Sequence, residues 1–277
     1  MAKKSAARTE SIPGFQNPAC YARALADCSR QVDDEHYISR SILERIPDPE
    51  NPASKAVLVR NLSFQKEGNV LQSIGVKSLS SKMLCKFHNN ALSSFDAAGL
   101  SFYMALEALD AEPRKHAPSR IIKEVDGDAF ERWMLKALIG GLYSGSFRLP
   151  SEMSMKDEQP TLEMLHILYR GAEFPPGTGL YWTPPSPGTA TNPGREPLQV
   201  GAVPDINNTI VGAFRVFLFG LDFSLLLLGP APGVPTIFDT ACFRPSGLRV
   251  DGLKTEIKFK WKAGPGSDRI EIRRFAG

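Results

Sequence analysis

The stretch Leu84–Asp96 reads LCKFHNNALSSFD and brings a thiol, an imidazole and a carboxamide close together in the chain. The C-x2-H spacing of Cys85 and His88 places a sulfur and a ring nitrogen on one side of a single helical turn, close enough to ligate one metal ion. Asn89 follows His88 directly and therefore points about 100° away around the helix. We expect this one element to serve two sites, one on each side.

Two upstream cysteines complete a set of metal ligands. Cys20 and Cys28 precede the acidic-histidine pair Glu35-His36. Thiolates and an imidazole nitrogen are donors that zinc prefers, and four of them in a tetrahedron form a closed structural site. The sequence therefore predicts one structural zinc ion, with the ligands Cys20, Cys28, Cys85 and His88. The alternative is that these cysteines are small buried core residues and that His88 lies at the surface.

The composition indicates a globular protein of ordinary charge. The chain has 277 residues, of which 42% are hydrophobic and 23% are charged, and its formal net charge is +3. This mild charge permits a nucleic-acid partner without requiring one. The polar, basic stretch Met1–Ser11 predicts no secretory signal, and Val211–Leu228 is too polar for a membrane span. The 4 cysteines are few for a secreted disulfide scaffold, so we expect a cytoplasmic, reducing location.

Breaks in the pattern divide the chain into three parts. Residues 1–17 are predicted to form a flexible basic arm, and residues 18–112 a zinc-stabilised module. Residues 113–277 are predicted to form a helical connection followed by an antiparallel β-rich domain. The prolines within residues 113–118 mark the boundary. The predicted fold class is therefore α+β.

Local patterns predict the elements of these parts. From residue 80 the spacing of Met83, Phe87 and Ala91 predicts a helix. Two further helices are expected at residues 129–143 and 161–169, capped by Asp128 and Thr161. Strands are predicted within residues 31–39 and at 57–64, 70–76, 179–183, 198–203, 209–219, 221–228, 255–262 and 268–275, the last two forming a hairpin.

These residues resemble the HNH nucleases, the ββα-metal family. In that family a strand carries an acidic residue followed by histidine. A helix then opens with a C-x2-C or C-x2-H pair, followed by a metal-binding His or Asn. Glu35-His36 matches the strand signature, and the helix signature is matched by Cys85, His88 and Asn89. Asn61 is the candidate for the middle Asn of the family pattern, and the resemblance covers about residues 20–96.

The resemblance implies a metal-dependent endonuclease, with DNA favoured over RNA as substrate. Phosphodiester cleavage needs an activated water and a cation at the phosphate. His36 is the expected general base, because imidazole titrates near neutral pH. Glu35 and Asn89 offer oxygen ligands, which suit Mg²⁺ or Mn²⁺. Asp96 lies seven residues after Asn89 on the same helical face and is a further candidate ligand.

The C-terminal strands predict a basic surface. Residues 254–262 alternate strictly, with hydrophobic side chains on one face and lysines on the other. The outward basic residues of the two last strands are Lys258, Lys260, Lys262, Arg269 and Arg273. They predict phosphate binding. The alternative is a solvated sheet face whose lysines protect an edge strand.

Two other functions fit the same residues. One is a non-catalytic, zinc-stabilised module that binds nucleic acid or protein. The other is a subunit whose β domain binds a protein partner, or a second copy of the chain, in a larger assembly. A plasmid-cleavage assay with Mg²⁺ or Mn²⁺ separates the nuclease from the binding module. Size-exclusion chromatography with light scattering tests the assembly.

Overall fold

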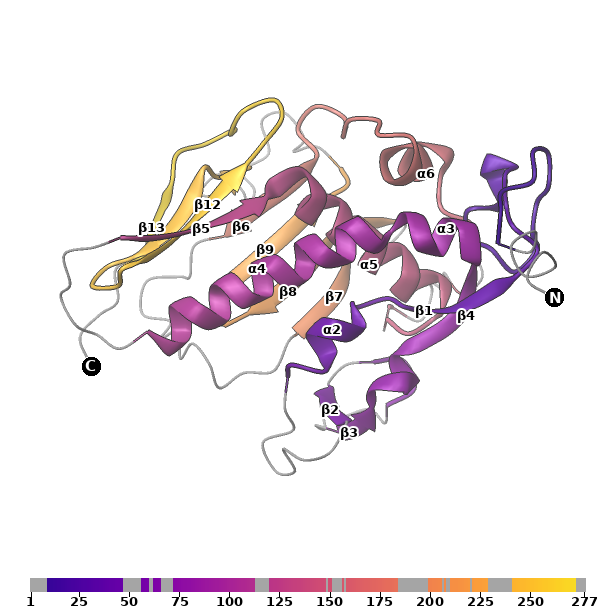
Figure 1. Ribbon diagram of the computed structural model, residues 1–277, viewed down its shortest axis with the longest axis horizontal. Coiled ribbons are helices and arrows are strands. Elements are labelled where there is room, and N and C mark those ends of the chain that lie inside the picture. The colour runs from indigo at the N-terminus through magenta and orange to yellow at the C-terminus, as the bar shows by residue number, and fades with distance from the viewer. Residues whose placement is uncertain are drawn as a thin grey trace.

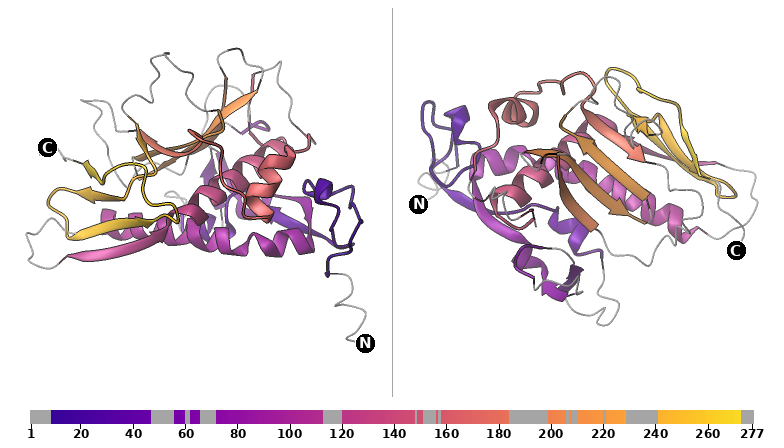
Figure 2. Two further views of the ribbon diagram at one scale, coloured as in Figure 1. Left: turned by 90° about the horizontal axis from the view of Figure 1, so that it is seen from above. Right: turned by 180° about the vertical axis from the view of Figure 1, so that it is seen from behind.

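The chain forms a mixed α+β structure in which two long helices lie against one face of an antiparallel sheet (Figure 1). Figure 2 shows the helices as one layer and the sheet as the other. The computed structural model describes residues 9–46, 56–59, 62–65, 72–112, 120–147, 149–150, 156, 158–183, 199–205, 207, 210–219, 221–228 and 241–272. Within these residues, no helix combines the length and the hydropathy needed to cross a membrane.

The N-terminal part is built on two antiparallel strands and the helix that follows them. Strand β1 (Val32–His36) pairs with β4 (Ser80–Cys85). Helix α3 (Lys86–Ala91) begins directly after β4 and contacts both strands. The shorter elements are η1 (Arg23–Leu25), α2 (Arg40–Leu43), β2 (Ala56–Val59), β3 (Gln72–Gly75) and η2 (Val76–Leu79). Strands β2 and β3 overlap the predicted strands at 57–64 and 70–76, and they pair antiparallel.

The prediction that a helix begins at residue 80 was wrong. Residues 80–85 form a strand because their backbone pairs with β1, and the helix starts only at Lys86. The register shifts where Met83 has no partner opposite it, and Met83, Leu84 and Cys85 are all buried in succession. Such a bulge breaks the alternation of inward and outward side chains that is typical of a strand. The four-residue spacing from Met83 to Phe87 therefore mimicked a helical stripe.

The folded part of the chain begins earlier than the predicted arm of residues 1–17 implied. The N–H of Ile12 donates to the carbonyl of Cys28 at 3.2 Å. The side-chain amide of Asn17 donates to the carbonyl of Ser29 at 3.1 Å. Residues 12–17 are therefore held against the cysteine loop. The predicted basic residues of the arm, Lys3, Lys4 and Arg8, lie outside the described residues.

Helix α5 (Gly127–Tyr143) is the centre of the fold. It packs against α4 (Ser93–Ala111) and contacts strands of both larger sheets. Every residue from 130 to 141 is buried, so this helix faces the core on all sides rather than along one stripe. Helices α4 and α5 approach closely because Gly99 faces Trp133. A Cβ atom at Gly99 would lie only 2.7 Å from the indole ring.

The strands of the two larger sheets follow in sequence. They are β5 (Ile121–Asp126), β6 (Gly179–Thr183), β7 (Gln199–Pro204), β8 (Val211–Leu218), β9 (Leu221–Leu226), β10 (Cys242–Phe243), β11 (Gly247–Val250), β12 (Thr255–Lys260) and β13 (Ile270–Ile272). The five-stranded sheet has the order β10-β6-β9-β8-β7 and is antiparallel throughout. The four-stranded sheet has the order β13-β11-β12-β5 and contains two parallel pairs, β11 with β13 and β5 with β12.

The predicted hairpin of residues 255–262 and 268–275 was wrong. Strand β11 lies between β12 and β13, antiparallel to the first and parallel to the second. A strand has only two edges for backbone pairing, and those of β12 are taken by β11 and β5. The C-terminal region is thus β-rich, as predicted, but one of its sheets is mixed rather than antiparallel.

One hydrophobic core joins the predicted parts. A single cluster of buried side chains extends from Cys20 to Ile272. The rings of Phe102 on α4 and Phe259 on β12 are 5.6 Å apart, which links the predicted module to the C-terminal sheet. The predicted boundary at residues 113–118 lies outside the described residues, and the core continues on both sides of it.

One of the two predicted helix caps is confirmed and the other is wrong. The side chain of Thr161 caps α6 (Leu162–Tyr169), as predicted. Helix α5 is capped by Asp126 rather than Asp128, because the Asp126 carboxylate accepts from the N–H of Ala129 at 2.9 Å. Asp128 instead accepts from the backbone N–H of Lys262 at 2.7 Å, which ties the start of α5 to the C-terminal sheet.

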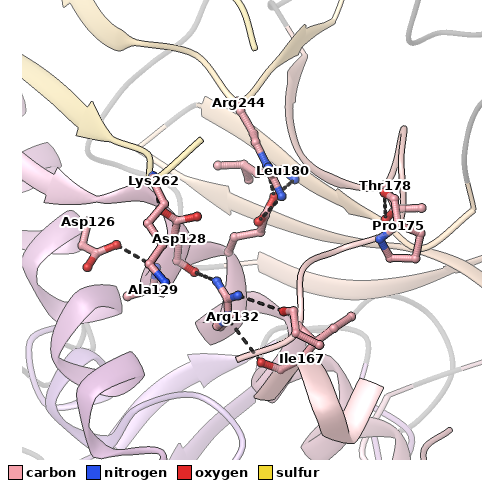
Figure 3. Close-up of polar contacts among 12 residues, drawn as sticks. Asp126, Asp128, Ala129, Arg132, Ile167, Pro175, Thr178, Leu180, Arg244 and Lys262 are labelled. Carbon is pink, nitrogen blue, oxygen red and sulfur yellow. Dashed lines mark hydrogen bonds and ion pairs between the residues drawn. The ribbon is translucent and has the colours of Figure 1, made fainter. Parts of the chain in front are cut away.

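Buried charged side chains fasten α5 to its other neighbours, as Figure 3 shows. Glu131 is fully buried and accepts from the N–H of Leu180 at 2.6 Å and from Arg244 at 2.9 Å. Arg132 donates to the carbonyl of Ile167 at 3.2 Å. Because each of these charges has a partner, α5 tolerates them in an otherwise apolar setting.

Candidate metal centre and adjoining site

The four predicted zinc ligands lie together and are all buried, with their donor atoms within 4.8 Å of one another. Nδ1 of His88 is 3.5 Å from Sγ of Cys20, 3.8 Å from Sγ of Cys28 and 3.2 Å from Sγ of Cys85. A tetrahedral zinc ion, with Zn–S about 2.3 Å and Zn–N about 2.0–2.1 Å, places sulfur and nitrogen about 3.5–3.6 Å apart. The donor set therefore fits a structural zinc ion in both chemistry and spacing.

Local backbone contacts explain how distant cysteines reach one point. Cys20 and Cys28 flank the loop that contains η1, and the N–H of Tyr21 donates to the carbonyl of Met83 at 3.0 Å. This bond fixes the loop to β4, whose last residue is Cys85. Cys85 is also the N-cap residue of α3, so that His88 follows within the first turn. Strand, loop and helix start thus converge on the same four donor atoms.

Further groups orient the ligands from outside the set. With Nδ1 of His88 turned to the sulfurs, its Nε2 lies 2.9 Å from Oδ1 of Asp27. A carboxylate behind a metal-binding histidine fixes the ring orientation and strengthens the ligand. Asp27 is held in turn by an ion pair with Arg170, and the ring of Tyr169 packs edge-on against His88 at 4.8 Å. Residues at the end of α6 therefore support the metal centre.

Close contacts among the three thiols and His88 shift the pKa values of Cys20, Cys85 and His88. Contacts with the thiols of Cys28 and Cys85 raise the pKa of Cys20, and contacts with Cys20 and Cys28 lower the pKa of Cys85. Burial lowers the pKa of His88, but its contacts with Cys28 and Cys85 raise the pKa to about 9. The cluster thus combines thiolate with retained protons, and a metal ion would displace those protons as it bound.

The predicted catalytic residues lie beside the metal centre but divide into two groups. Nδ2 of Asn89 on α3 is 3.4 Å from Oδ2 of Asp33 on β1. Glu35, two residues further along β1, is buried, and its carboxylate contacts the ammonium of Lys136 on α5. The structure therefore brings Asn89 to Asp33 and Glu35 to Lys136. Both Asp33 and Lys136 are additions that the sequence interpretation did not include.

Lys136 also contacts Asp96, the further candidate ligand. Its Nζ is 2.5 Å from Oδ1 of Asp96, and the same oxygen accepts a hydrogen bond from the hydroxyl of Ser39. The indole N–H of Trp133 donates to the Ser39 hydroxyl at 2.7 Å. We call Glu35, Lys136, Asp96 and Ser39 the lysine cluster. It joins β1, α4 and α5 through charged and hydrogen-bonded groups.

Burial and neighbouring charges shift the pKa values of the acidic-histidine pair, Glu35 and His36. Burial raises the pKa of Glu35 to about 7, although the ammonium of Lys136 acts in the opposite direction. Burial, with the charges of Arg40 and Lys136, lowers the pKa of His36, so its imidazole is neutral at neutral pH. Nε2 of His36 is enclosed and has no hydrogen-bond partner in the described part of the chain. This nitrogen has a vacant acceptor position, but a water molecule would have to enter the enclosure to reach it.

The predicted basic surface is compensated in part by acidic side chains. Lys258 and Lys260 are exposed on β12, as expected. Lys260 pairs with Glu124 at 2.5 Å, and Arg269 pairs with Glu256 at 2.9 Å. Two other residues of interest, Arg273 of this surface and Asn61 of the family pattern, lie outside the described residues. The sheet and the metal centre are at opposite ends of the molecule (Figure 1).

A separate apolar pocket lies on another side of α5. It has a volume of about 370 Å³, within the range of small-molecule sites. Its walls include Leu138, Ile139, Met164, Ile167 and Leu227. Its two glutamates, Glu158 and Glu163, are exposed. The pocket therefore offers hydrocarbon rather than a set of buried reactive groups, and the chemistry is concentrated at the β1–α3 site.

Comparison with known proteins gives no family for the chain. None of the protein families, curated proteins and solved structures with which it was compared matches it.

Proposed function

We propose that this protein is a metal-dependent endonuclease of the ββα-metal type that hydrolyses phosphodiester bonds in DNA. One observation carries the proposal. The metal centre fastens the β1–β4 pair to α3, and Asn89 of α3 then contacts Asp33 of β1, two residues before Glu35-His36. A helix and a strand that are locked in this way hold their polar side chains in a fixed relation, as catalysis requires.

His36 is assigned the role of general base. The unpaired Nε2 of His36 is enclosed, so the substrate and its water would have to open the site before this nitrogen could act. It would then take a proton from the water while the water oxygen bonds to phosphorus. The bond from phosphorus to the leaving sugar oxygen would break, and that oxygen would take a proton from solvent. By the resemblance, Glu35 and Asn89 would supply ligands to a Mg²⁺ or Mn²⁺ ion, and Asp33 would add a carboxylate beside Asn89. Such an ion would neutralise charge on the phosphate.

The test is cleavage of supercoiled plasmid, single-stranded DNA and RNA with Mg²⁺ or Mn²⁺. His36→Ala should lower the cleavage rate roughly 10²- to 10⁴-fold, the usual effect of losing a general base. Zinc content and thermal stability should stay close to wild type, because His36 is not a zinc ligand. His166→Ala is the matched control, since His166 is exposed on α6. Equal cleavage by both variants would contradict the assignment of His36.

A second candidate is a zinc-stabilised module that binds nucleic acid or protein without cleaving it. The specific observation in its favour is that Lys136 already neutralises Glu35 and Asp96, two residues expected to face a divalent ion. If the wild type cleaves none of the three substrates with either cation, and binds no second metal besides zinc, the nuclease proposal fails. Binding of the same substrates, measured by fluorescence anisotropy, would then support the second candidate.

A further inference from the structure

We propose that the ammonium of Lys136 takes the place of a divalent ion between Glu35 and Asp96 in the proposed active site. Divalent ions are then excluded from the Glu35–Asp96 pair. Any ion that the reaction needs binds without Glu35. This inference rests on the proposed function and changes the role of two residues within it. Glu35 becomes the anchor of Lys136 rather than a metal ligand. Lys136, contributed by a helix outside residues 18–112, becomes a positioning residue of the site.

The position of the ammonium carries the inference. Nζ of Lys136 contacts carboxylate oxygens of both Glu35 and Asp96, which is the bridging position that a divalent ion would take between two carboxylates. The side chain of Lys136 is 1% exposed, that of Glu35 is 9% exposed and that of Asp96 is 30% exposed. Mg²⁺ needs about six oxygen ligands and usually keeps several waters. The ammonium already occupies the position between the two carboxylates, so such a hydrated ion could reach only the solvent side of Asp96.

The lysine is also held where it is. Helix α5 is buried on all sides around residue 136, so the side chain has no solvent to turn towards. Moving the ammonium off both carboxylates would leave it unpaired among apolar groups, which is strongly unfavourable. The hydroxyl of Ser39 donates to Oδ1 of Asp96 and accepts from the indole N–H of Trp133. An incoming ion would therefore have to displace an ammonium that is paired with two carboxylates.

Lys136 fixes the position of His36 through its contact with Glu35. Glu35 is held by α5, and His36 follows it directly on β1. Lys136 thus fixes the end of β1 that carries the proposed base, while the metal centre fixes the other end, where Val32 lies opposite Cys85. Because Lys136 is enclosed, it acts on the reaction through Glu35 and not by touching the substrate.

Trp133 provides a reporter within the wild-type chain. Its indole N–H is linked through Ser39 to Asp96, so an ion bound at Asp96 would change its chemical shift. Trp261 is the internal reference, because its indole N–H donates to the carbonyl of Pro245 at 2.9 Å, away from this cluster. The experiment titrates MgCl₂ into the zinc-loaded, ¹⁵N-labelled full chain and follows both indole signals. No saturable shift of Trp133 is expected in the wild type.

Three variants sharpen the result. Lys136→Met frees two carboxylates and should give a saturable Mg²⁺-dependent shift of Trp133. Lys136→Arg keeps a cation and should remain as insensitive as the wild type. Lys258→Met, at an exposed lysine of β12, is the matched control and should change nothing. If Lys136→Met does not fold, the wild-type titration still decides.

The outcomes separate this inference from the proposed function. A saturable Mg²⁺-dependent shift of Trp133 in the wild type, with Trp261 unchanged, would overturn the inference even if the protein cleaves DNA. Absence of cleavage would overturn the nuclease proposal and leave the exclusion of Mg²⁺ from Glu35 and Asp96 standing. Cleavage with no shift at Trp133 supports both.

Discussion

The metal centre and the lysine cluster are two largely buried groups of polar side chains, one at each end of β1, and their charges are balanced in different ways. The metal centre gathers three thiols and an imidazole, and the positive charge of that imidazole rests on a proton that a bound metal ion would displace. The lysine cluster gathers two carboxylates around an ammonium that the chain itself supplies. The first would therefore be completed by an ion from solution, whereas the second needs only groups that the chain itself supplies.

The two groups hold opposite ends of β1 in different ways. At its first residue the strand is tied to Cys85 and through it to the metal centre. At Glu35 it is tied to α5, and through α5 to both larger sheets. Removing the metal and removing the lysine should therefore damage different parts of the molecule.

The largest effect is expected from loss of zinc. Structural zinc contributes on the order of 10 kcal/mol to folding in small modules, so Cys85→Ser should unfold the cysteine loop and release the start of β1. Cys242→Ser is the control, because Cys242 lies in β10, outside the metal centre. The measurements are zinc content by mass spectrometry and unfolding by circular dichroism. Folded Cys85→Ser protein with about one zinc per chain would contradict the ligand assignment.

The second effect comes from breaking the lysine cluster. Lys136→Met leaves the buried carboxylate of Glu35 and the partly exposed carboxylate of Asp96 without a counter-charge, which should lower the free energy of unfolding by about 3–5 kcal/mol. Replacing the cluster as Glu35→Gln, Asp96→Asn and Lys136→Met together should recover part of that loss. Urea denaturation measures both. A Lys136→Met variant as stable as the exposed-site control Lys258→Met would show that the cluster contributes little.

A smaller effect is expected behind His88. Asp27→Asn removes the negative charge next to Nε2 and should weaken zinc binding about 10- to 100-fold, the usual cost of losing such a partner. The protein should still fold with zinc in excess. Competition with a chromogenic chelator measures the affinity, and Asp34→Asn, at an exposed position of β1, is the control. Equal zinc affinity in the two variants would remove Asp27 from the metal centre.

The smallest effect is expected at the C-terminal strands. Replacing Lys258, Lys260 and Lys262 with Gln should change the log-log salt slope of DNA binding by less than about one, the value for a single phosphate contact. The reason is that Lys260 and the nearby Arg269 are already paired with carboxylates. A slope that flattens by two or more would instead establish these lysines as a phosphate-binding surface.

The sequence was most informative where the chemistry of a residue is specific. Thiols and imidazole have few uses in common, so Cys20, Cys28, Cys85 and His88 could be grouped before their distances were known. Alternation also placed the lysines of β12 outward and its hydrophobic residues inward. These signals depend on side-chain type or on neighbours within a few residues, and both are visible in the sequence.

Non-local pairing is what the sequence could not supply. The strand at residues 80–85 was taken for a helix because a bulge disturbed its alternation. The C-terminal hairpin was wrong because β11 and β5 occupy both edges of β12. Lys136 was missed because its partners come from β1 and α4. The position of Lys136 among apolar residues of the predicted helix could have indicated a buried ion pair, because a buried charge needs a partner.

The pairing of β5 with β12 sets an order of events during synthesis of the chain. Ile121 pairs with Thr255, which the ribosome adds 134 residues later. At about 5–20 residues per second, that interval lasts roughly 7–27 s. All four candidate zinc ligands emerge before β5 does, whereas β12, which pairs with β5, is made near the end of the chain. A nascent chain can therefore load its metal well before the helix that carries Lys136 is anchored against the C-terminal sheet.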